Sequence, residues 1–167
     1  MESRAAGRIP EMRSAEAEIV PMVRSDLGSV CSLENRSFQT PWDRQSFEVS
    51  ISHSNSAAWV ARHRGQIVGY LIAFLRGHEL LIANLAVEDK HRRSGLASRL
   101  ISHILAEAAS QGLRYAVLDV RESNAGAINL YSRFGFRVIG KRRGYYSSPP
   151  EDGLIMYRRL EEEVSED

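Results

Sequence analysis

The stretch HRRSGLAS, residues 91–98, joins a basic turn directly to the start of an apolar helix pattern. The first turn of a helix has N–H groups without intrahelical partners and carries a partial positive charge. Gly95 lets a ligand approach the backbone closely, and Ala97 keeps bulky side chains away. Arg92 and Arg93 can add charge-assisted contacts. The stretch therefore predicts a site for an anionic group such as a pyrophosphate.

A plainer explanation of the same residues is a surface turn with solvated arginines, and the stretch alone does not decide between the two. Two other kinds of phosphate site are excluded. The chain contains no G-x-x-x-x-G-K-[ST], the P-loop of NTPases. It also lacks a G-x-G-x-x-G followed by an acidic residue about twenty positions on, which is the Rossmann fingerprint.

Hydrophobic patterns on both sides of this stretch predict a mixed α/β sheet. Apolar side chains recur every three and four positions in 96–108, which indicates an amphipathic helix that Gly112 ends. Upstream, short turns join three apolar runs into an antiparallel meander. The predicted strands are 18–23, 57–63, 66–76, 79–87, 114–121, 136–146 and 152–160. The other predicted helices are 27–34, capped by Ser25–Asp26, 41–52, capped by Asp43, and 124–134.

Length and composition indicate one globular domain. The chain has 167 residues, 43% of them hydrophobic and 26% charged, with a formal net charge of +1. A charge so close to neutral gives no general attraction to nucleic acid or membranes. Cys31 is the single cysteine, so no internal disulfide can form, and no apolar run is long enough to span a bilayer. We expect a cytoplasmic protein with a flexible tail at 1–17, one domain at 18–160 and an acidic tail at 161–167.

Several motifs resemble those of the GNAT family of N-acetyltransferases. RRSGLA, residues 92–97, fits the R/Q-x-x-G-x-G/A signature of the family, and LDVRESNAGAINLYSRFGF, residues 118–136, resembles its second half. SFQTPW at 37–42 and RGYYSSPPEDGLIM at 143–156 narrow the resemblance to the RimI-type ribosomal-protein-alanine N-acetyltransferases. The resemblance covers residues 18–160. It implies an α/β (α+β) domain whose mostly antiparallel sheet is splayed between the fourth and fifth strands and flanked by helices.

The resemblance also implies acetyl-CoA as the cofactor. In the family, the strand before the pyrophosphate loop offers backbone groups to the pantetheine arm, and the loop and helix start bind the pyrophosphate. An asparagine at the start of the following helix contacts the cofactor as well. The corresponding residues are Leu85, Ala86 and Val87 in the strand, Arg92, Arg93, Ser94, Gly95, Leu96, Ala97 and Ser98 in the loop and helix start, and Asn124.

Two catalytic residues are implied by the same resemblance. The general base of the family is a glutamate in an L-E-V-R stretch, where this chain has Asp119, and the tyrosine near the thioester sulfur corresponds to Tyr131. Aspartate is one methylene shorter than glutamate, so we expect Asp119 to act through a water. We expect Tyr131 to stabilise the departing thiolate by a hydrogen bond. Without the resemblance, the alternatives are an aspartate in a local ion pair and an ordinary core tyrosine.

An N-terminal amine suits a weak base of this kind. Its pKa is about 7.7–8.0, against about 10.4 for a lysine amine, so roughly 10% of it is neutral at pH 7.

In the family, the segment that corresponds to Tyr145 and Tyr146 covers the peptide amine, and Phe38 and Trp42 are expected to form the opposite wall. Ordinary packing is the alternative for each of them. The expected partner is a protein N-terminus, and the resemblance implies the N-terminal alanine of small-subunit ribosomal protein eighteen.

Other functions remain open from the sequence. One is an acetyltransferase with a small-molecule amine substrate. Another is a non-catalytic acetyl-CoA-binding module, which the aspartate at position 119 keeps in consideration. We expect no metal, because the five histidines show no ligand spacing. We also expect no direct contact with nucleic acid or a membrane, and a monomer or weak oligomer.

Overall fold

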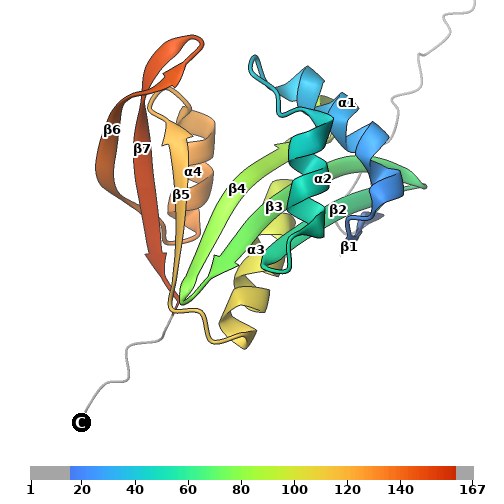
Figure 1. The fold of residues 1–167 in the computed structure, drawn as a ribbon, viewed down its shortest axis with the longest axis horizontal. Coiled ribbons are helices and arrows are strands. Elements are labelled where there is room, and N and C mark those ends of the chain that lie inside the picture. Colours follow the sequence, from blue (N-terminus) through green and yellow to red (C-terminus); the bar gives the residue numbers. More distant parts are fainter. Residues whose placement is uncertain (1–15, 161–167) are drawn as a thin grey trace, which may run out of the picture.

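The computed structural model describes residues 16–160, in which helices cover both faces of a seven-stranded sheet (Figure 1). The chain runs through β1 (Glu18–Pro21), η2 (Arg24–Asp26), α1 (Leu27–Ser37), α2 (Arg44–Ser52), β2 (Ser56–His63), β3 (Gln66–Arg76), β4 (Glu79–Val87), η3 (Asp89–His91), α3 (Leu96–Ser110), β5 (Tyr115–Arg121), α4 (Ala125–Arg133), β6 (Arg137–Ser147) and β7 (Pro150–Arg159). Each predicted strand and helix is present, with boundaries shifted by a few residues. Apart from Glu16 and Ala17, the predicted tails lie outside the described residues.

The two predicted helix caps have different outcomes. Asp43 begins α2 as expected, because its Oδ1 accepts from the Ser46 amide at 2.8 Å. Asp26 does not cap α1 with its side chain, so that prediction is wrong. Its Oδ2 accepts instead from the Val23 amide at 2.8 Å, and its Oδ1 lies 2.6 Å from Nη2 of Arg62. The turn η2 precedes α1 directly, so the carboxylate closes that turn.

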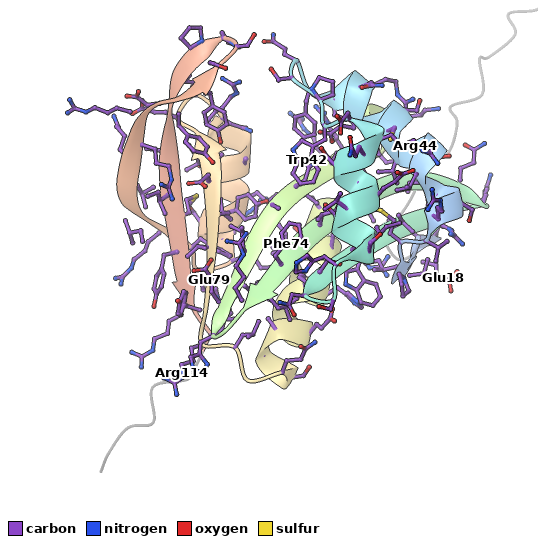
Figure 2. The ribbon with its side chains drawn as sticks, viewed as in Figure 1. Glu18, Trp42, Arg44, Phe74, Glu79 and Arg114 are labelled. Carbon is purple, nitrogen blue, oxygen red and sulfur yellow. The ribbon has the colours of Figure 1, made fainter. Side chains whose placement is uncertain are left out.

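One pair of neighbouring strands is parallel, and it opens along its length. The strand order is β1-β2-β3-β4-β5-β7-β6, and all neighbours except β4 and β5 are antiparallel. β4 and β5 pair only where Glu79–Leu81 faces Tyr115–Val117. Beyond this short ladder the two strands diverge (Figure 1), and in Figure 2 Glu79 and Arg114 lie at the closed end. The splay predicted between the fourth and fifth strands is confirmed.

Two apolar clusters lie on opposite faces of the sheet. The larger contains buried residues of α3 and α4, and the smaller contains those of α1 and α2 over β2–β4. Ala116, Leu118 and Val120 of β5 belong to the larger cluster. Among the described residues, the smaller cluster includes no member of β5, β6 or β7. The other face of β5, which carries Asp119 and Arg121, therefore lies outside the core beneath α1 and α2.

Candidate active site

The outer part of β4 has a backbone edge that no strand pairs. Residues 85–87, the predicted pantetheine strand, pair with 69–71 of β3 on one side. The ladder to β5 has already ended at Leu81. Since a strand presents N–H and C=O groups along both edges, the edge of 85–87 that faces β5 can bond an extended ligand. Residues 85–87 can therefore offer backbone groups to an extended ligand, while their contact with a pantetheine arm stays a prediction.

The loop before α3 is tightly turned by two left-handed residues. Arg93 has φ 61°, uncommon for a residue with a Cβ, and Gly95, the N-cap of α3, has φ 84°. Ser94 Oγ donates to the His91 carbonyl at 2.5 Å. Gly95 has no side chain with which to cap the helix, so the amides of residues 96–98 lack both a cap and an intrahelical acceptor. These amides, with the positive end of the helix dipole, form a site suited to a phosphate group.

The two arginines of this loop differ in their surroundings. Arg92 forms an ion pair with Asp89, with Nη2 2.9 Å from Oδ1, and both side chains are exposed. Arg93 is exposed and forms no ion pair with any residue in the described range 16–160. Of these two arginines, Arg93 can therefore bind an anionic ligand without breaking an existing ion pair, whereas Arg92 would have to leave Asp89.

Asp119 lies on β5 in an ion pair that spans the neighbouring strand. Its Oδ1 accepts from Arg142 Nε at 2.9 Å, and its side chain is 23% exposed. Arg142 belongs to β6, so its side chain reaches across β7 to β5. The local ion pair considered as an alternative is therefore present. It engages one carboxylate oxygen, and Oδ2 accepts no hydrogen bond from any described residue.

Tyr131 is buried on the other face of β5. It is 7% exposed, packs edge-on against Phe136 at 5.6 Å between ring centroids, and belongs to the cluster that contains Leu118 and Val120. Burial raises the pKa of its phenol well above the usual value. Within residues 16–160 its hydroxyl has no hydrogen-bond partner. Asp119 and Tyr131 thus lie on opposite faces of the sheet at β5. A single ligand could contact both side chains only at the edge of β5 from which β4 diverges.

Asn124 begins α4. Its Oδ1 accepts from the Ala127 amide at 3.1 Å, so the side chain caps the helix. The side-chain NH2 group remains as a possible donor to a ligand. The structure thus explains this asparagine as a cap, while the predicted cofactor contact stays a prediction.

The two predicted substrate walls are connected to each other. Phe38, 39% exposed, ends α1, and Trp42 packs against Phe47 at the start of α2. Trp42 lies at the edge of the helical layer nearest to β5 and α4 (Figure 2). On the other side, Tyr145 and Tyr146 pack edge to face at 5.1 Å in the β6–β7 hairpin. Thr40 Oγ1 in the α1–α2 loop donates to the Ser148 carbonyl of the hairpin at 3.0 Å, which joins the walls above the diverging strands.

The hairpin tyrosines lie close to the candidate base. Burial in the first place, and then the charge of Asp119, raises the pKa of Tyr146. A Cβ on Gly153 of β7 would lie 3.3 Å from atoms of both tyrosine rings, so the absence of a side chain there makes room for them. The tyrosines predicted to cover an amine are therefore brought near Asp119.

The contacts that four residues make around the site were missed from the sequence: those of Glu34, Thr40, Arg121 and Arg142. Glu34 is 1% exposed in α1 and accepts hydrogen bonds from the Trp42 amide at 3.0 Å, from Asn84 Nδ2 at 3.0 Å and from the Tyr70 hydroxyl. Burial raises its pKa, against the effect of the Trp42 and Asn84 bonds. An acidic residue in the apolar stripe of a helix was the available signal, since a buried carboxylate needs partners.

Surface hollows lie beside the site and away from it. One of about 440 Å³ is lined by Trp42 and residues of α2. A larger one, about 720 Å³, lies between β1 and α3 and contains none of the predicted site residues.

Within residues 16–160, no group of three or more His, Cys, Asp or Glu side chains is arranged to hold a metal ion. The same range contains no helix with the length and hydropathy needed to cross a bilayer.

Comparison with known proteins relates this architecture to one family. Residues 27–136 match the model of the acetyltransferase (GNAT) family. The chain is 31% identical over 134 residues to the ribosomal protein bS18-alanine N-acetyltransferase of Escherichia coli strain K12, an alignment that covers 79% of this chain and 90% of that relative. The crystal structure of the ribosomal-protein-S18-alanine N-acetyltransferase from Escherichia coli matches with a TM-score of 0.83 at 27% identity over 90% of this chain and 98% of that one. Ard1 from Thermoplasma volcanium shares the fold, with a TM-score of 0.83 at 24% identity, 88% of this chain and 99% of that one being covered.

Proposed function

Because this chain belongs to the acetyltransferase (GNAT) family, we propose that it transfers the acetyl group of acetyl-CoA to the N-terminal amine of a protein. The proposed acceptor is the N-terminal alanine of ribosomal protein bS18, the substrate in the name of the Escherichia coli relative. One structural observation carries the proposal. The α1–α2 loop and the tyrosine hairpin, which are the two predicted substrate walls, meet where the Thr40 hydroxyl donates to the Ser148 carbonyl at 3.0 Å.

The residues present fit acetyl-CoA. The amides of 96–98, with Arg93 beside them, would hold its pyrophosphate, and the unpaired edge of 85–87 would hold its pantetheine arm. Bound there, acetyl-CoA supplies a thioester carbonyl open to attack by an amine. Leu96 is 1% exposed, so this residue can contribute only its backbone.

Proton transfer from the amine is assigned to Asp119. The carboxylate faces the side of the sheet on which the hairpin tyrosines lie, and its Oδ2 has no donor among the described residues. The shorter side chain of aspartate makes a bridging water the natural relay. Arg142 holds the other oxygen, which orients the carboxylate.

Tyr131 is assigned to the leaving sulfur. In this assignment the hydroxyl acts from the face of β5 that packs in the larger apolar cluster, opposite to the face that carries Asp119. Because burial raises the pKa of the phenol, Tyr131 remains a hydrogen-bond donor at neutral pH. A donor aimed at developing negative charge stabilises the transition state more than the bound substrates.

Transfer to a peptide with a free and with a blocked N-terminus tests the proposal. We expect the purified chain to acetylate a peptide that begins with the N-terminal residues of ribosomal protein bS18, and mass spectrometry to place the acetyl group on the α-amine. The same peptide with a blocked amine but an internal lysine should give no product. Equal turnover of both peptides, or turnover confined to polyamines or aminoglycosides, would refute the assignment.

A further inference from the structure

The tip of the β6–β7 hairpin is not held by regular strand pairing alone. Lys141 and Arg142 pair with Leu154 and Gly153, but the register then shifts until Tyr146 faces Glu151. Residues 143–145 of β6 therefore bulge opposite a single residue of β7, which interrupts the ladder below the tip. The tyrosines that face the acceptor site depend on other contacts for their position.

Arg121 of β5 supplies several of those contacts, besides the 2.8 Å bond from the Gly144 amide to Asp152 Oδ1 and the placement of Arg142 over the Tyr145 ring. Nη2 of Arg121 donates to the Ser148 carbonyl at 3.1 Å, and its Nη1 donates to the Pro149 carbonyl at 3.0 Å and lies 3.3 Å from Glu151 Oε2. Its guanidinium carbon lies 4.3 Å from the centroid of the Tyr146 ring. One side chain thus binds two carbonyls, a carboxylate and an aromatic ring of the same hairpin.

The same contacts reach the opposite wall. The Ser148 carbonyl that accepts from Arg121 also accepts from Thr40 of the α1–α2 loop. Only 26% of the Arg121 side chain is exposed, so the guanidinium is largely enclosed by its partners. Strand alternation places Arg121 on the same face as Asp119, roughly 6–7 Å further along β5.

We propose that Arg121 is the positioning residue of the acceptor site. Its planar fork fixes the tyrosine hairpin and, through Ser148, the α1–α2 loop above Asp119. Arg121 touches no reacting atom and acts only through the hairpin. This inference rests on the proposed function, because the hairpin affects acetyl transfer only if an amine enters beneath it. Lysine would keep the charge and the ring contact, but its single ammonium cannot reproduce the fork.

Steady-state kinetics of four variants test this role. We compare Arg121→Met and Arg121→Lys with Arg143→Met, which removes an exposed arginine of the same hairpin that forms no ion pair within residues 16–160. Both Arg121 variants should raise the KM for the peptide about tenfold or more, change kcat by about threefold or less and leave the KM for acetyl-CoA unchanged. Arg143→Met should match the wild type. Thr40→Val should raise the peptide KM in the same direction by a smaller factor.

Three kinetic results would overturn the proposal. Full rescue by lysine would mean that charge, and not the fork, is what the site needs. A parallel rise in the KM for acetyl-CoA, or a loss of kcat with an unchanged peptide KM, would place the role of Arg121 outside the acceptor site.

Hydrogen exchange separates this inference from the proposed function. Without substrates, the amides of residues 144–148 should exchange faster in both Arg121 variants than in the wild type or Arg143→Met. Unchanged exchange would mean that Arg121 does not hold the hairpin. If the wild-type chain acetylates no α-amine, the activity assay refutes the proposed function. Hydrogen exchange then decides by itself whether Arg121 fixes the hairpin.

Discussion

Aspartate at position 119 combines two features that shape the proposed chemistry. Its side chain is shorter than that of the family's glutamate, and Arg142 occupies one of its oxygens at 2.9 Å. Arg142 therefore fixes the orientation of the carboxylate, and Oδ2 of Asp119 is left to accept a hydrogen bond from a relay water. The ion pair and the catalytic role, treated as alternatives in the sequence, are compatible in the structure.

Replacing Asp119 tests the base directly. Asp119→Asn should lower kcat/KM for the peptide about 100-fold at pH 7, because general-base catalysis contributes on that order. The deficit should shrink above pH ~8, where the α-amine is already largely neutral. Asp119→Glu should keep most of the activity. A pH–rate profile for each variant gives the answer, and a deficit that does not depend on pH would contradict the assignment.

Replacing Tyr131 with phenylalanine should affect the rate of catalysis without affecting the stability of the fold. Its hydroxyl bonds to no described residue, so Tyr131→Phe should leave the free energy of unfolding in urea unchanged or slightly higher. In contrast, kcat should fall about 100-fold, as for loss of a donor to a developing anion. The Kd for acetyl-CoA, measured by calorimetry, should stay close to the wild-type value. A drop in stability with unchanged kcat would make this tyrosine an ordinary core residue.

At the scale of elements, α3 has left-handed glycines just outside both of its ends. Gly95 has φ 84° before the helix, where the anion site is proposed, and Gly112 has φ 75° after it. Both positions favour glycine for the same backbone reason. They lie at opposite ends of the helix, and only Gly95 is next to the proposed anion site, so Gly112 is the control for backbone strain.

Alanine at each position should separate strain from binding. Gly95→Ala and Gly112→Ala should each cost about 1–2 kcal/mol of stability in urea unfolding. Only Gly95→Ala should also raise the Kd for acetyl-CoA, since its Cβ enters the proposed pyrophosphate site. Equal acetyl-CoA affinities in the two variants would argue against an anion at this helix start.

The elements themselves were predictable because their signals are local. Period-three-and-four apolar spacing predicted the helix that the structure has as α3, Leu96–Ser110. The cap at Asp26 was predicted wrongly because a short 3-10 turn, which leaves no periodic signal, precedes α1 and takes the carboxylate. Side-chain partners over longer separations, such as Arg142 for Asp119, left no trace in these patterns.

At the scale of the whole molecule, the rings of two histidines lie close together between the sheet and the candidate cofactor loop. His63 ends β2 and His91 lies in η3, with ring centroids 5.9 Å apart. Burial in the first place, then His63 and Lys90, lowers the pKa of His91 from 6.5, while Glu88 acts in the opposite direction. The unfolded chain therefore takes up a proton at His91 more readily than the folded protein does.

This difference predicts a dependence of global stability on pH. Above pH ~6.5 the contribution of His91 is fully present, and it is lost as the pH falls through the lowered pKa of the folded state. Urea unfolding at pH 7.5 and 5.5 should show a smaller loss of stability in His91→Gln than in the wild type. His103→Gln, on α3 and away from this pair, is the control. Identical losses in the wild type and His91→Gln would exclude His91 as the cause.

The sequence by itself determined the strands and helices and the glycine turn before α3, and through family motifs it supplied the residues proposed for one site. These follow from periodicity, capping and backbone conformation, which act within a few residues. Only the tertiary structure placed β7 between β5 and β6, so that Arg142 reaches Asp119 across it. It also brought Thr40 to Ser148 over a separation of 108 positions and gathered the hairpin around Arg121. Such contacts depend on how strands from distant parts of the chain are ordered and twisted in one sheet, which no local pattern encodes.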